Sequence, residues 1–427
     1  MSKYQAYPEY QDSGIEWANQ IPQHWNSASL SKLFEIKAGG DLKVNYFSEE
    51  KDKDHPFPIY TNANDEKAVY GYTSKPFFKG NSITVSGRGE VGYAVYRDHP
   101  FDAIIRLLVL SPTKKLNLKF FTYFIKDVID FQVESSAIGQ LSTSQISPFK
   151  VVFPAVEEQT QIAVFLDYET AKIDTLIEKQ QQLIELLKEK RQAVISHAVT
   201  KGLNPDATMK DSGVEWLGEV PEHWVVTKTS YCSTSLDAFR IPIEANIRGN
   251  RQGQYPYYGA SGVIDFVDDY LFDDDLILVC EDGWNLMLRT QPVARFVTGK
   301  IWVNNHAHIL KPIDIDATLL AECIELTPLN LFISGMRQPK LTADSLKNIP
   351  VAYSIDKEEQ DELVNFISKY KKQILQLTNK AQHSIELLQE RRTALISAAV
   401  TGKIDVRNWI APTTSSDTNE AAQEVTA

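Results

Sequence analysis

Two long stretches of the chain carry apolar residues at helical spacing. In residues 157–200 apolar side chains recur every three, four or seven positions, and no Pro or Gly occurs before Gly202. Residues 357–401 repeat the pattern, and Asp356 followed by Glu359 predicts a capping pair at their start. The spacing predicts one amphipathic helix per stretch, each with a stripe that needs a partner. We expect the two helices to cover each other's stripes as an antiparallel coiled coil.

The segments before each helix have a different pattern. Residues 26–155 and 225–355 contain short apolar runs separated by Gly, Asn and Asp, which is typical of strands and turns. The runs predict strands over 82–86, 92–96, 276–280 and 307–310, and short helices over 119–126 and 317–324. The pattern therefore predicts two globular mixed α/β (α+β) domains joined by two long helices.

The chain repeats itself. Asp12-Ser-Gly-Ile-Glu-Trp17 recurs as Asp211-Ser-Gly-Val-Glu-Trp216, at an offset of 199 residues. Residues 184–191 recur as residues 385–392, at an offset of 201. The agreement predicts a pseudo-twofold internal repeat of one unit. The middle segments of the two halves, 26–155 and 225–355, differ in sequence more than the helical ends do. This difference favours different tasks for the two domains over neutral drift.

The repeat gives a domain plan of five segments. We predict a first domain over 1–155, a helical spacer over 156–203, a second domain over 204–355, a second spacer over 356–405, and a disordered polar tail over 406–427. The tail is richest in Thr, Ser, Asp, Glu and Ala from Thr413 on, a composition too polar to fold alone.

Composition narrows the possible functions. The chain has 427 residues and a net charge of −12, which excludes a protein that coats DNA through gross positive charge. No apolar run approaches the ~18 residues of a membrane span, so we expect no membrane association and a cytoplasmic location. The three cysteines are widely spaced and fit neither a disulfide framework nor a zinc cluster.

Motifs for catalysis are scarce. Gly87-Arg-Gly-Glu-Val-Gly92 matches a dinucleotide-binding pattern, but the run after it predicts a strand rather than a helix, so we interpret it as a turn between strands. His306 and His308 would share one face of a strand, but two imidazoles do not make a metal site. Residues 205–210 resemble a nuclease motif without its second acid. We expect no catalytic residue, cofactor or metal in this chain.

Recognition suits the remaining residues better. Tyr, Asn, Gln, Ser and Arg cluster in the two middles, and amides and Arg can read base edges in the major groove. For any single residue an ordinary surface role is the commoner alternative. The candidate DNA-binding residues are Tyr60, Asn62, Asn64, Arg88, Gln140, Ser142, Ser144, Tyr258, Ser261, His306, Arg337 and Lys340.

The order of motifs resembles a known family. Each half of the chain begins with Asp-Ser-Gly-x-Glu-Trp and Pro-x-His-Trp, and its long helix ends with Glu-Leu-Leu-x-Glu-x-Arg and Ala-Val-Thr. Glu158-Gln159 opens the first helix between them. This order of motifs is similar to that of specificity subunits of type I restriction–modification enzymes. The second helix departs from the pattern at Lys372-Gln-Ile, where the first has Lys172-Ile-Asp. The resemblance covers nearly the whole chain.

The resemblance implies a function. The two middles would be target recognition domains, each binding half of a bipartite, asymmetric site in double-stranded DNA. The helices would set the gap and dock two methyltransferase subunits, and restriction–translocase subunits would complete the complex. S-adenosylmethionine, ATP and Mg²⁺ would belong to those partners.

Two other functions stay open from the sequence alone. The chain could be a self-contained DNA methyltransferase or nuclease, which turnover by the purified chain would reveal. It could instead be a coiled-coil scaffold whose middles bind protein, in which case DNA footprinting of the assembled complex would show no protection by them.

Overall fold

The computed structural model describes residues 4–62, 69–131, 140–335 and 337–412. The predicted disordered tail, 406–427, is described only as far as residue 412, and this part is packed: Val406 is 1% exposed and Trp409 contacts Phe165 of the first long helix. Residues 413–427 lie outside the described residues, and so does the candidate Asn64.

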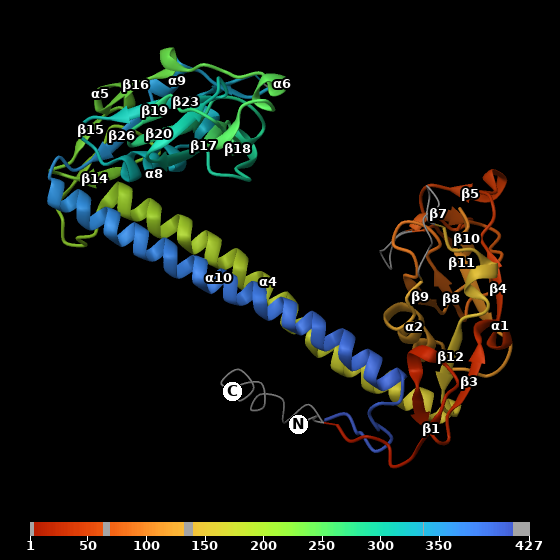
Figure 1. Ribbon diagram of the computed structural model, residues 1–427. Coiled ribbons are helices and arrows are strands. Elements are labelled where there is room, and N and C mark those ends of the chain that lie inside the picture. Colours follow the sequence, from red (N-terminus) through yellow and green to blue (C-terminus); the bar gives the residue numbers. More distant parts are fainter. Residues whose placement is uncertain (1–3, 63–68, 132–139, 336, 413–427) are drawn as a thin grey trace. The chain divides into compact units, whose positions relative to one another are not determined.

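Within this part the chain forms two compact units (Figure 1). The first unit contains Met1–Gln180 and His383–Ala427, and the second contains Gln181–Gln382. The division falls inside both long helices, whereas the predicted boundaries follow chain segments, so those boundaries stay predictions. The predicted fold class is confirmed: mixed helix-and-sheet domains occur together with two long helices that pack against each other.

The first unit is built on two four-stranded sheets. One is antiparallel, in the order β4-β11-β8-β9, and the other has the order β10-β6-β7-β5 with β10 parallel to β6. Two small sheets pair β1 with β2 and β3 with β12. The strands are β1 (Tyr10–Asp12), β2 (Gln20–Pro22), β3 (Asn26–Ser29), β4 (Phe34–Ala38), β5 (Phe47–Ser48), β6 (Phe57–Tyr60), β7 (Val69–Thr73), β8 (Ser82–Val85), β9 (Ala94–Arg97), β10 (Asp102–Ala103), β11 (Leu108–Pro112) and β12 (Lys150–Phe153). The helices before the first long one are α1 (Leu30–Leu33), α2 (Leu118–Asp127) and α3 (Thr143–Ile146).

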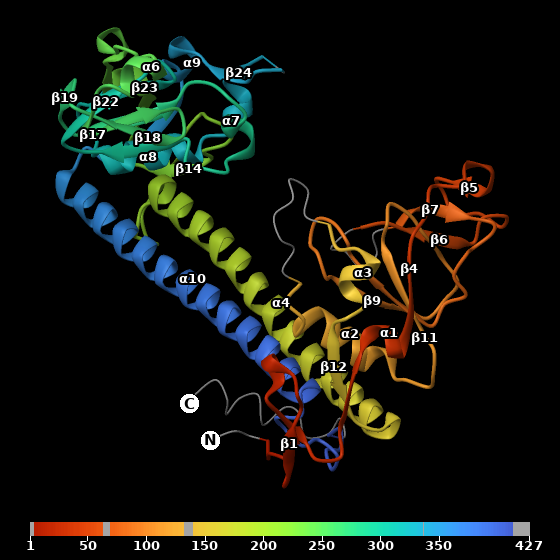
Figure 2. The same ribbon diagram turned by 45° about the vertical axis from the view of Figure 1, so that its right-hand side comes forward.

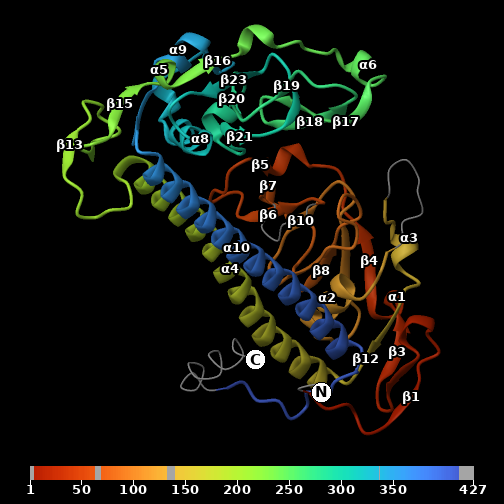
Figure 3. The ribbon, with the colours of Figure 1, turned by 60° about the vertical axis from the view of Figure 1, so that its left-hand side comes forward.

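The layers of the first unit explain its apolar runs. Helix α2 packs on β8 and β9 (Figure 1), and Figure 3 shows α2 beside β8 from another side. On β11, Leu108 and Leu110 belong to the same core as α2, while Val109 belongs to the core shared with Tyr60 of the other sheet. A strand covered on both faces is apolar at successive positions, as this one is.

The second unit repeats this plan. Its antiparallel sheet has the order β16-β23-β20-β21, and its other sheet the order β18-β17-β22-β19 with β17 parallel to β22. The strands are β13 (Met209–Asp211), β14 (Glu219–Pro221), β15 (Val225–Lys228), β16 (Ser233–Ser235), β17 (Gln252–Gly259), β18 (Gly262–Val267), β19 (Phe272–Asp273), β20 (Leu276–Cys280), β21 (Ala294–Val297), β22 (Lys300–Val303), β23 (Ala307–Pro312), β24 (Ile333–Ser334), β25 (Lys340–Leu341) and β26 (Pro350–Tyr353). The short helices are α5 (Thr229–Cys232), α6 (Ala245–Arg248), α7 (Asn285–Leu288), α8 (Ala317–Leu326) and α9 (Ala343–Lys347).

The two units share their core and differ at one sheet edge. Helix α8 packs on β20 and β21 as α2 packs on β8 and β9. The parallel pair β6–β10 corresponds to β17–β22. The fourth strand of the second sheet lies on opposite edges, because β5 pairs with β7 whereas β19 pairs with β22. The internal repeat is thus conserved in the centre of each domain and altered at its periphery.

The two predicted long helices are α4 (Val156–Lys201) and α10 (Lys357–Val400). In the first unit Ile162 and Leu166 near the start of α4 share a core with Ile396 near the end of α10. In the second unit Ile195 near the end of α4 shares a core with Leu363 near the start of α10. The helices therefore run antiparallel along each other's apolar stripes (Figures 1 and 2). No helix in the described part of the chain has the length and apolarity to cross a membrane.

The repeated Pro-x-His-Trp motif anchors the start of each long helix. Trp25 Nε1 donates to Glu158 Oε1 at 3.1 Å, and His24 Nε2 lies 2.8 Å from Glu158 Oε2. A carboxylate in the first turn is also favoured by the helix dipole. The motif thus fixes where α4 leaves the domain.

The second copy makes the same contacts and corrects the capping prediction. Trp224 Nε1 donates to Glu359 Oε1 at 3.0 Å, and His223 Nε2 lies 2.8 Å from Glu359 Oε2. Asp356 does cap α10, since its Oδ1 accepts from the N–H of Glu358 at 3.1 Å, but Glu359 is not the reciprocal member of a capping box. Burial alone would raise the pKa of Glu359; the hydrogen bonds from Ser354, Trp224 and His223 outweigh it and lower that pKa.

A buried glutamine follows each of these glutamates. Gln159 and Gln360 are both 1% exposed and each joins the long helix to the loop before the short helix of its domain. Gln159 Oε1 accepts from the N–H of Asn117 at 2.9 Å, and Gln159 Nε2 donates to the carbonyl of Pro154 at 2.9 Å. Gln360 Oε1 accepts from the N–H of Asp316 at 2.7 Å, and Gln360 Nε2 donates to the carbonyls of Asp314 and Ser354 at 2.9 and 2.7 Å.

Candidate nucleic-acid interface

Three loops meet at one edge of the first unit: the loops after β6 and after β8, and the segment before α3. Asn62 Oδ1 accepts from the N–H of Gly87 at 2.7 Å, and its Nδ2 donates to the carbonyl of Ile105 at 2.5 Å. The N–H of Leu141 donates to the carbonyl of Gly87 at 2.8 Å. A Cβ at Gly87 would lie 2.9 Å from the Leu141 carbonyl oxygen, so this approach of two backbones requires glycine.

Two more candidates meet at this junction. Arg88 donates from Nε and Nη2 to Gln140 Oε1, at 3.3 and 2.9 Å. The segment 87–92 joins β8 to β9, which confirms the predicted turn between strands and excludes the strand–helix setting of a dinucleotide site. Asn62, Arg88 and Gln140, which lie far apart in sequence, thus form one polar cluster.

Ser142 and Ser144 belong to the start of α3. Ser142 Oγ accepts from the N–H of Gln145 at 3.3 Å, and Gln145 Oε1 accepts from the N–H of Ser142 at 2.8 Å, which together make a capping box. Ser144 Oγ lies 2.9 Å from Ser142 Oγ. The two serines position the segment that carries Gln140.

Tyr60 lies in the core rather than on the surface. It is 5% exposed, its hydroxyl lies 2.9 Å from His99 Nε2, and the guanidinium of Arg97 stacks 3.7 Å from its ring centre. Burial raises the pKa of its hydroxyl. With both its ring and its hydroxyl engaged, Tyr60 supports the end of β6.

The structure adds a turn that sequence reasoning passed over. Between β10 and β11, Ile105 and Arg106 both adopt left-handed backbone conformations, with φ of 54° and 62°. Both residues are exposed, and Ile105 is held by Asn62. The Arg106 carbonyl oxygen would lie 3.3 Å from a Cβ at Gly87, so this turn adjoins the polar cluster.

The second unit forms its own junction from the corresponding loops. The N–H of Asn304 donates to the carbonyl of Tyr258 at 3.0 Å, and the N–H of Glu281 donates to the carbonyl of His306 at 3.0 Å. The N–H of Leu341 donates to the carbonyl of Glu281 at 2.8 Å. Tyr258, half-buried at the end of β17, and His306, in the turn before β23, therefore belong to one junction.

Ion pairs dominate this second junction. Glu281 accepts from Arg240 Nη1 at 2.6 Å and pairs with Lys340 Nζ at 3.1 Å. His306 Nδ1 lies 2.8 Å from Asp282 Oδ2. The candidates Lys340 and His306 are thus brought together by two neighbouring carboxylates.

His308 differs from His306. The two were expected on one face of a strand, but His306 precedes β23 and stays half-exposed, while His308 lies inside it and is 1% exposed. His308 Nδ1 lies 2.6 Å from Asp237 Oδ2 and Nε2 lies 2.9 Å from the carbonyl of Leu341. Both partners are acceptors, so both ring nitrogens carry protons. Burial opposes this charge, but the bonds to Asp237 and Leu341 outweigh it and raise the pKa of His308.

The last two candidates lie at the margin of the second junction. Ser261 is exposed, and its carbonyl accepts from Arg295 Nη2 at 2.9 Å. Arg337 is exposed in the connection between β24 and β25, whose second strand carries Lys340.

The two junctions correspond residue by residue. The bond from Leu141 to Gly87 has its counterpart in the bond from Leu341 to Glu281, 2.8 Å long in both units. Arg106 precedes β11 as His306, 200 residues later, precedes β23. This offset lies between the two repeat offsets, and it is the sequence signal that could have identified Arg106. The same scaffold positions therefore carry arginines and amides in one domain, and acids, histidine and lysine in the other.

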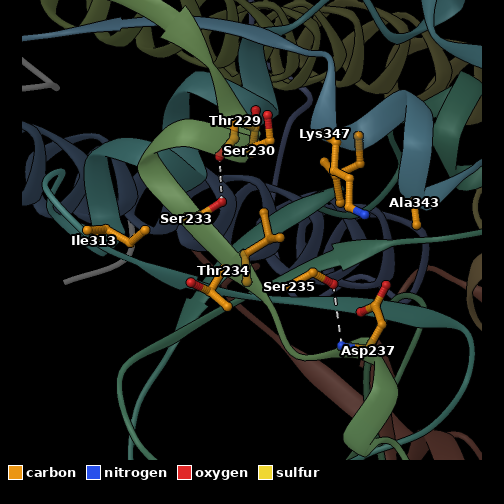
Figure 4. A pocket seen from close by; sticks show the side chains of 11 residues that line it. Thr229, Ser230, Ser233, Thr234, Ser235, Asp237, Ile313, Ala343 and Lys347 are labelled. Atoms are coloured by element: carbon orange, nitrogen blue, oxygen red, sulfur yellow. Dashed lines mark hydrogen bonds between the residues drawn. The ribbon is translucent and has the colours of Figure 1, made fainter.

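One cavity of the second unit offers little for catalysis. A cavity of about 360 Å³ lies between α5, β16 and α9 of the second unit (Figure 4). Ser233 Oγ donates to the Thr229 carbonyl at 2.7 Å, and Thr229 Oγ1 donates to the Ile349 carbonyl at 2.9 Å, so these hydroxyls support the backbone. Among the described residues no group of three His, Cys, Asp or Glu could hold a metal ion. Burial raises the pKa of Cys323 to about 12, which keeps its thiol protonated.

A family model matches the chain in two separate stretches. The model of the type I restriction modification DNA specificity domain matches residues 22–186 and 239–387. A putative type I specificity subunit of Mycoplasma pneumoniae is 32% identical over 153 residues, covering 34% of this chain and 41% of that protein. The EcoDI specificity subunit of Escherichia coli is 24% identical over 192 residues, covering 44% of this chain and 41% of that protein. The matches thus span about two fifths of the length of these curated relatives.

A solved structure shares the fold over a greater length. The structure comes from work on the structural basis of complex assembly and conformational transition of the type I R-M system. Its TM-score is 0.69 at 10% identity, and the match covers 90% of this chain and 99% of the solved one. Because the family model matches most of the chain in two copies, the chain belongs to the type I restriction modification DNA specificity family.

Proposed function

We propose that this chain is the DNA sequence-specificity subunit of a type I restriction–modification enzyme and binds a bipartite, asymmetric site in double-stranded DNA. The observation that carries the proposal is the pair of corresponding junctions. One frame occurs twice, and the loops at the same place in each copy carry different side chains. Two domains with the same backbone frame but different side chains at these loops suit two unlike half-sites.

The side chains at the junctions have the chemistry of base readers. Arginine forks and amides pair with guanine and adenine edges, and a carboxylate can accept from the amino group of cytosine. The first junction offers Arg88, Arg106 and Gln140, with Asn62 holding the loops together, whereas the second offers Asp282 with His306 and Lys340. The domains would therefore prefer different bases.

The net charge indicates that DNA is not held by this chain alone. The net charge of −12 has the same sign as the DNA phosphates, and non-specific affinity depends on neutralised phosphates. Cationic partner subunits that close around the DNA would supply that neutralisation. We therefore propose that methylation and cleavage, with S-adenosylmethionine, ATP and Mg²⁺, reside in those subunits, and that this chain is not catalytic.

The long helices present apolar side chains beyond those that pack between them. The exposed leucines are Leu176, Leu183 and Leu186 on α4, and Leu375, Leu377 and Leu387 on α10. Exposed apolar side chains repeated along a helix mark surfaces that another protein covers. We assign these surfaces to two methyltransferase subunits, and the helices themselves to a spacer between the half-sites.

The test is the methylation pattern that the chain directs. The chain is expressed together with type I modification subunits of its own organism, and methylated adenines are mapped across the host genome. A two-part motif with a fixed gap supports the proposal. An absent or undivided motif contradicts it, and methylation or cleavage of DNA by the purified chain alone would favour the enzyme alternative.

A deletion tests the spacer separately. Removing residues 179–185 and 379–385 takes one heptad from each helix and keeps the apolar stripes in phase. At about 1.5 Å per residue the helices shorten by about 10 Å, the length of roughly three base pairs. The gap in the motif should shorten accordingly while both half-sites stay the same; an unchanged gap would refute the spacer role.

A further inference from the structure

The turn between β10 and β11 holds its side chains in a sterically disfavoured way. Left-handed backbone is rare for residues other than Gly, Asn and Asp, and for a β-branched residue such as Ile105 it is a genuine outlier. Here two such residues follow each other, Ile105 and Arg106, with φ of 54° and 62°. The Ile105 N–H donates to the carbonyl of Gly40 at 3.2 Å, and its carbonyl accepts from Asn62 at 2.5 Å, so the surroundings impose the conformation.

A second arginine with left-handed backbone, Arg289, has a structural reason for this conformation. Arg289, with φ of 49°, ends α7, and its guanidinium donates to the carbonyls of Glu325 and Thr327. Arg106 has no such role, because its side chain is exposed and bonds to no other described residue. A strained turn that exposes a side chain with no bonding partner among the described residues indicates a partner outside the protein.

The place of the turn indicates what that partner is. Arg106 adjoins the junction of Asn62, Arg88 and Gln140, and its counterpart in the second domain is His306, which stands in the corresponding junction. The position thus projects a different polar side chain in each domain from the same frame. A position that varies in this way suits the discrimination of half-sites.

We propose that Arg106 recognises a guanine in the half-site of the first domain, an inference that rests on the function proposed above. A guanidinium fork matches the O6 and N7 acceptors of guanine in the major groove, which is the commonest specific contact of arginine with DNA. The turn fixes the backbone before DNA arrives, and Asn62 fixes the turn. Ile105, exposed beside Arg106, offers an apolar contact next to the base.

The test compares Arg106→Gln with Lys115→Gln in the methyltransferase complex formed by the full chain. Both changes remove one positive charge from an exposed side chain, but Lys115 follows the far end of β11, beyond five residues of strand, about 16 Å from the turn. Once the wild-type motif is known, equilibrium binding is measured on duplexes in which each base pair of the motif is replaced in turn.

We expect the wild-type complex to prefer a G·C pair at one position of one half-site by about tenfold or more. Arg106→Gln should reduce that preference to less than about threefold and leave the other half-site unchanged. Lys115→Gln should keep every preference. The proposal is overturned if Arg106→Gln keeps all preferences, or if neither half-site contains a G·C pair that the wild type discriminates. A wild type without a two-part motif would instead refute the proposed function itself.

Discussion

Substitution of Arg106 should separate stability from recognition. An L-residue in left-handed backbone costs about 1–2 kcal/mol, and Asn tolerates this conformation far better than Arg. Since the Arg106 side chain is exposed and bonds to no other described residue, replacing it loses no contact that would offset the relief. We expect Arg106→Asn to raise the free energy of unfolding of the first unit by about 1 kcal/mol. Arg106→Val, which places a β-branched residue at φ 62°, should lower it by about 1 kcal/mol.

Calorimetry of the full chain measures this series. For units of roughly 150–250 residues, 1 kcal/mol corresponds to about 2–4 °C in the melting temperature. The order should be Asn, then Arg, then Val, while both variants lose the guanine preference. If Arg106→Asn were neutral or destabilising, or if Val were as stable as Arg, the turn would not be strained and the inference drawn from it would lose its basis.

Three further predictions concern buried polar groups. His308→Gln should destabilise the second unit by about 3 kcal/mol, because Asp237 loses the cation 2.6 Å away and keeps the more distant Arg240, at 3.7 Å. Since the pKa of His308 is raised, its contribution is full below about pH 6.5 and is lost as pH rises through the folded value. A deficit that failed to shrink toward alkaline pH would contradict this. The pKa of Glu359 is lowered, so the stability that its carboxylate contributes is present above about pH 4.3 and is lost on acidification. In urea titrations between about pH 6 and 3, the free energies of unfolding of the wild type and of Glu359→Gln should converge. A constant difference between the two would argue against this role. Gln360→Leu should cost about 3 kcal/mol by leaving the Ser354 carbonyl and the Asp316 N–H unpaired, measured by hydrogen exchange at the start of α8; full protection there would disprove the cost.

The sequence was informative wherever a property is local or repeated. Helical spacing of apolar residues identified α4 and α10, because one stripe must be buried along the whole length of each helix. Short apolar runs identified strands such as β8 and β20, and the segment 87–92 proved to be the predicted turn. The duplicated motifs identified the family, since they recur in the same order in both halves at offsets of 199 and 201 residues.

What depends on contacts between distant segments was decided by the tertiary structure alone. Glu359 reads as a capping residue from its spacing, but the fold brings His223 and Trp224 to it. Tyr60 reads as a surface aromatic, but two packed sheets enclose it. Arg106 reads as a charge interrupting an apolar run, and its backbone conformation arises from Gly40 and Asn62, which no local pattern connects to it. Periodicity reports which face of an element is buried, whereas the environment of a loop side chain depends on which other loops fold against it.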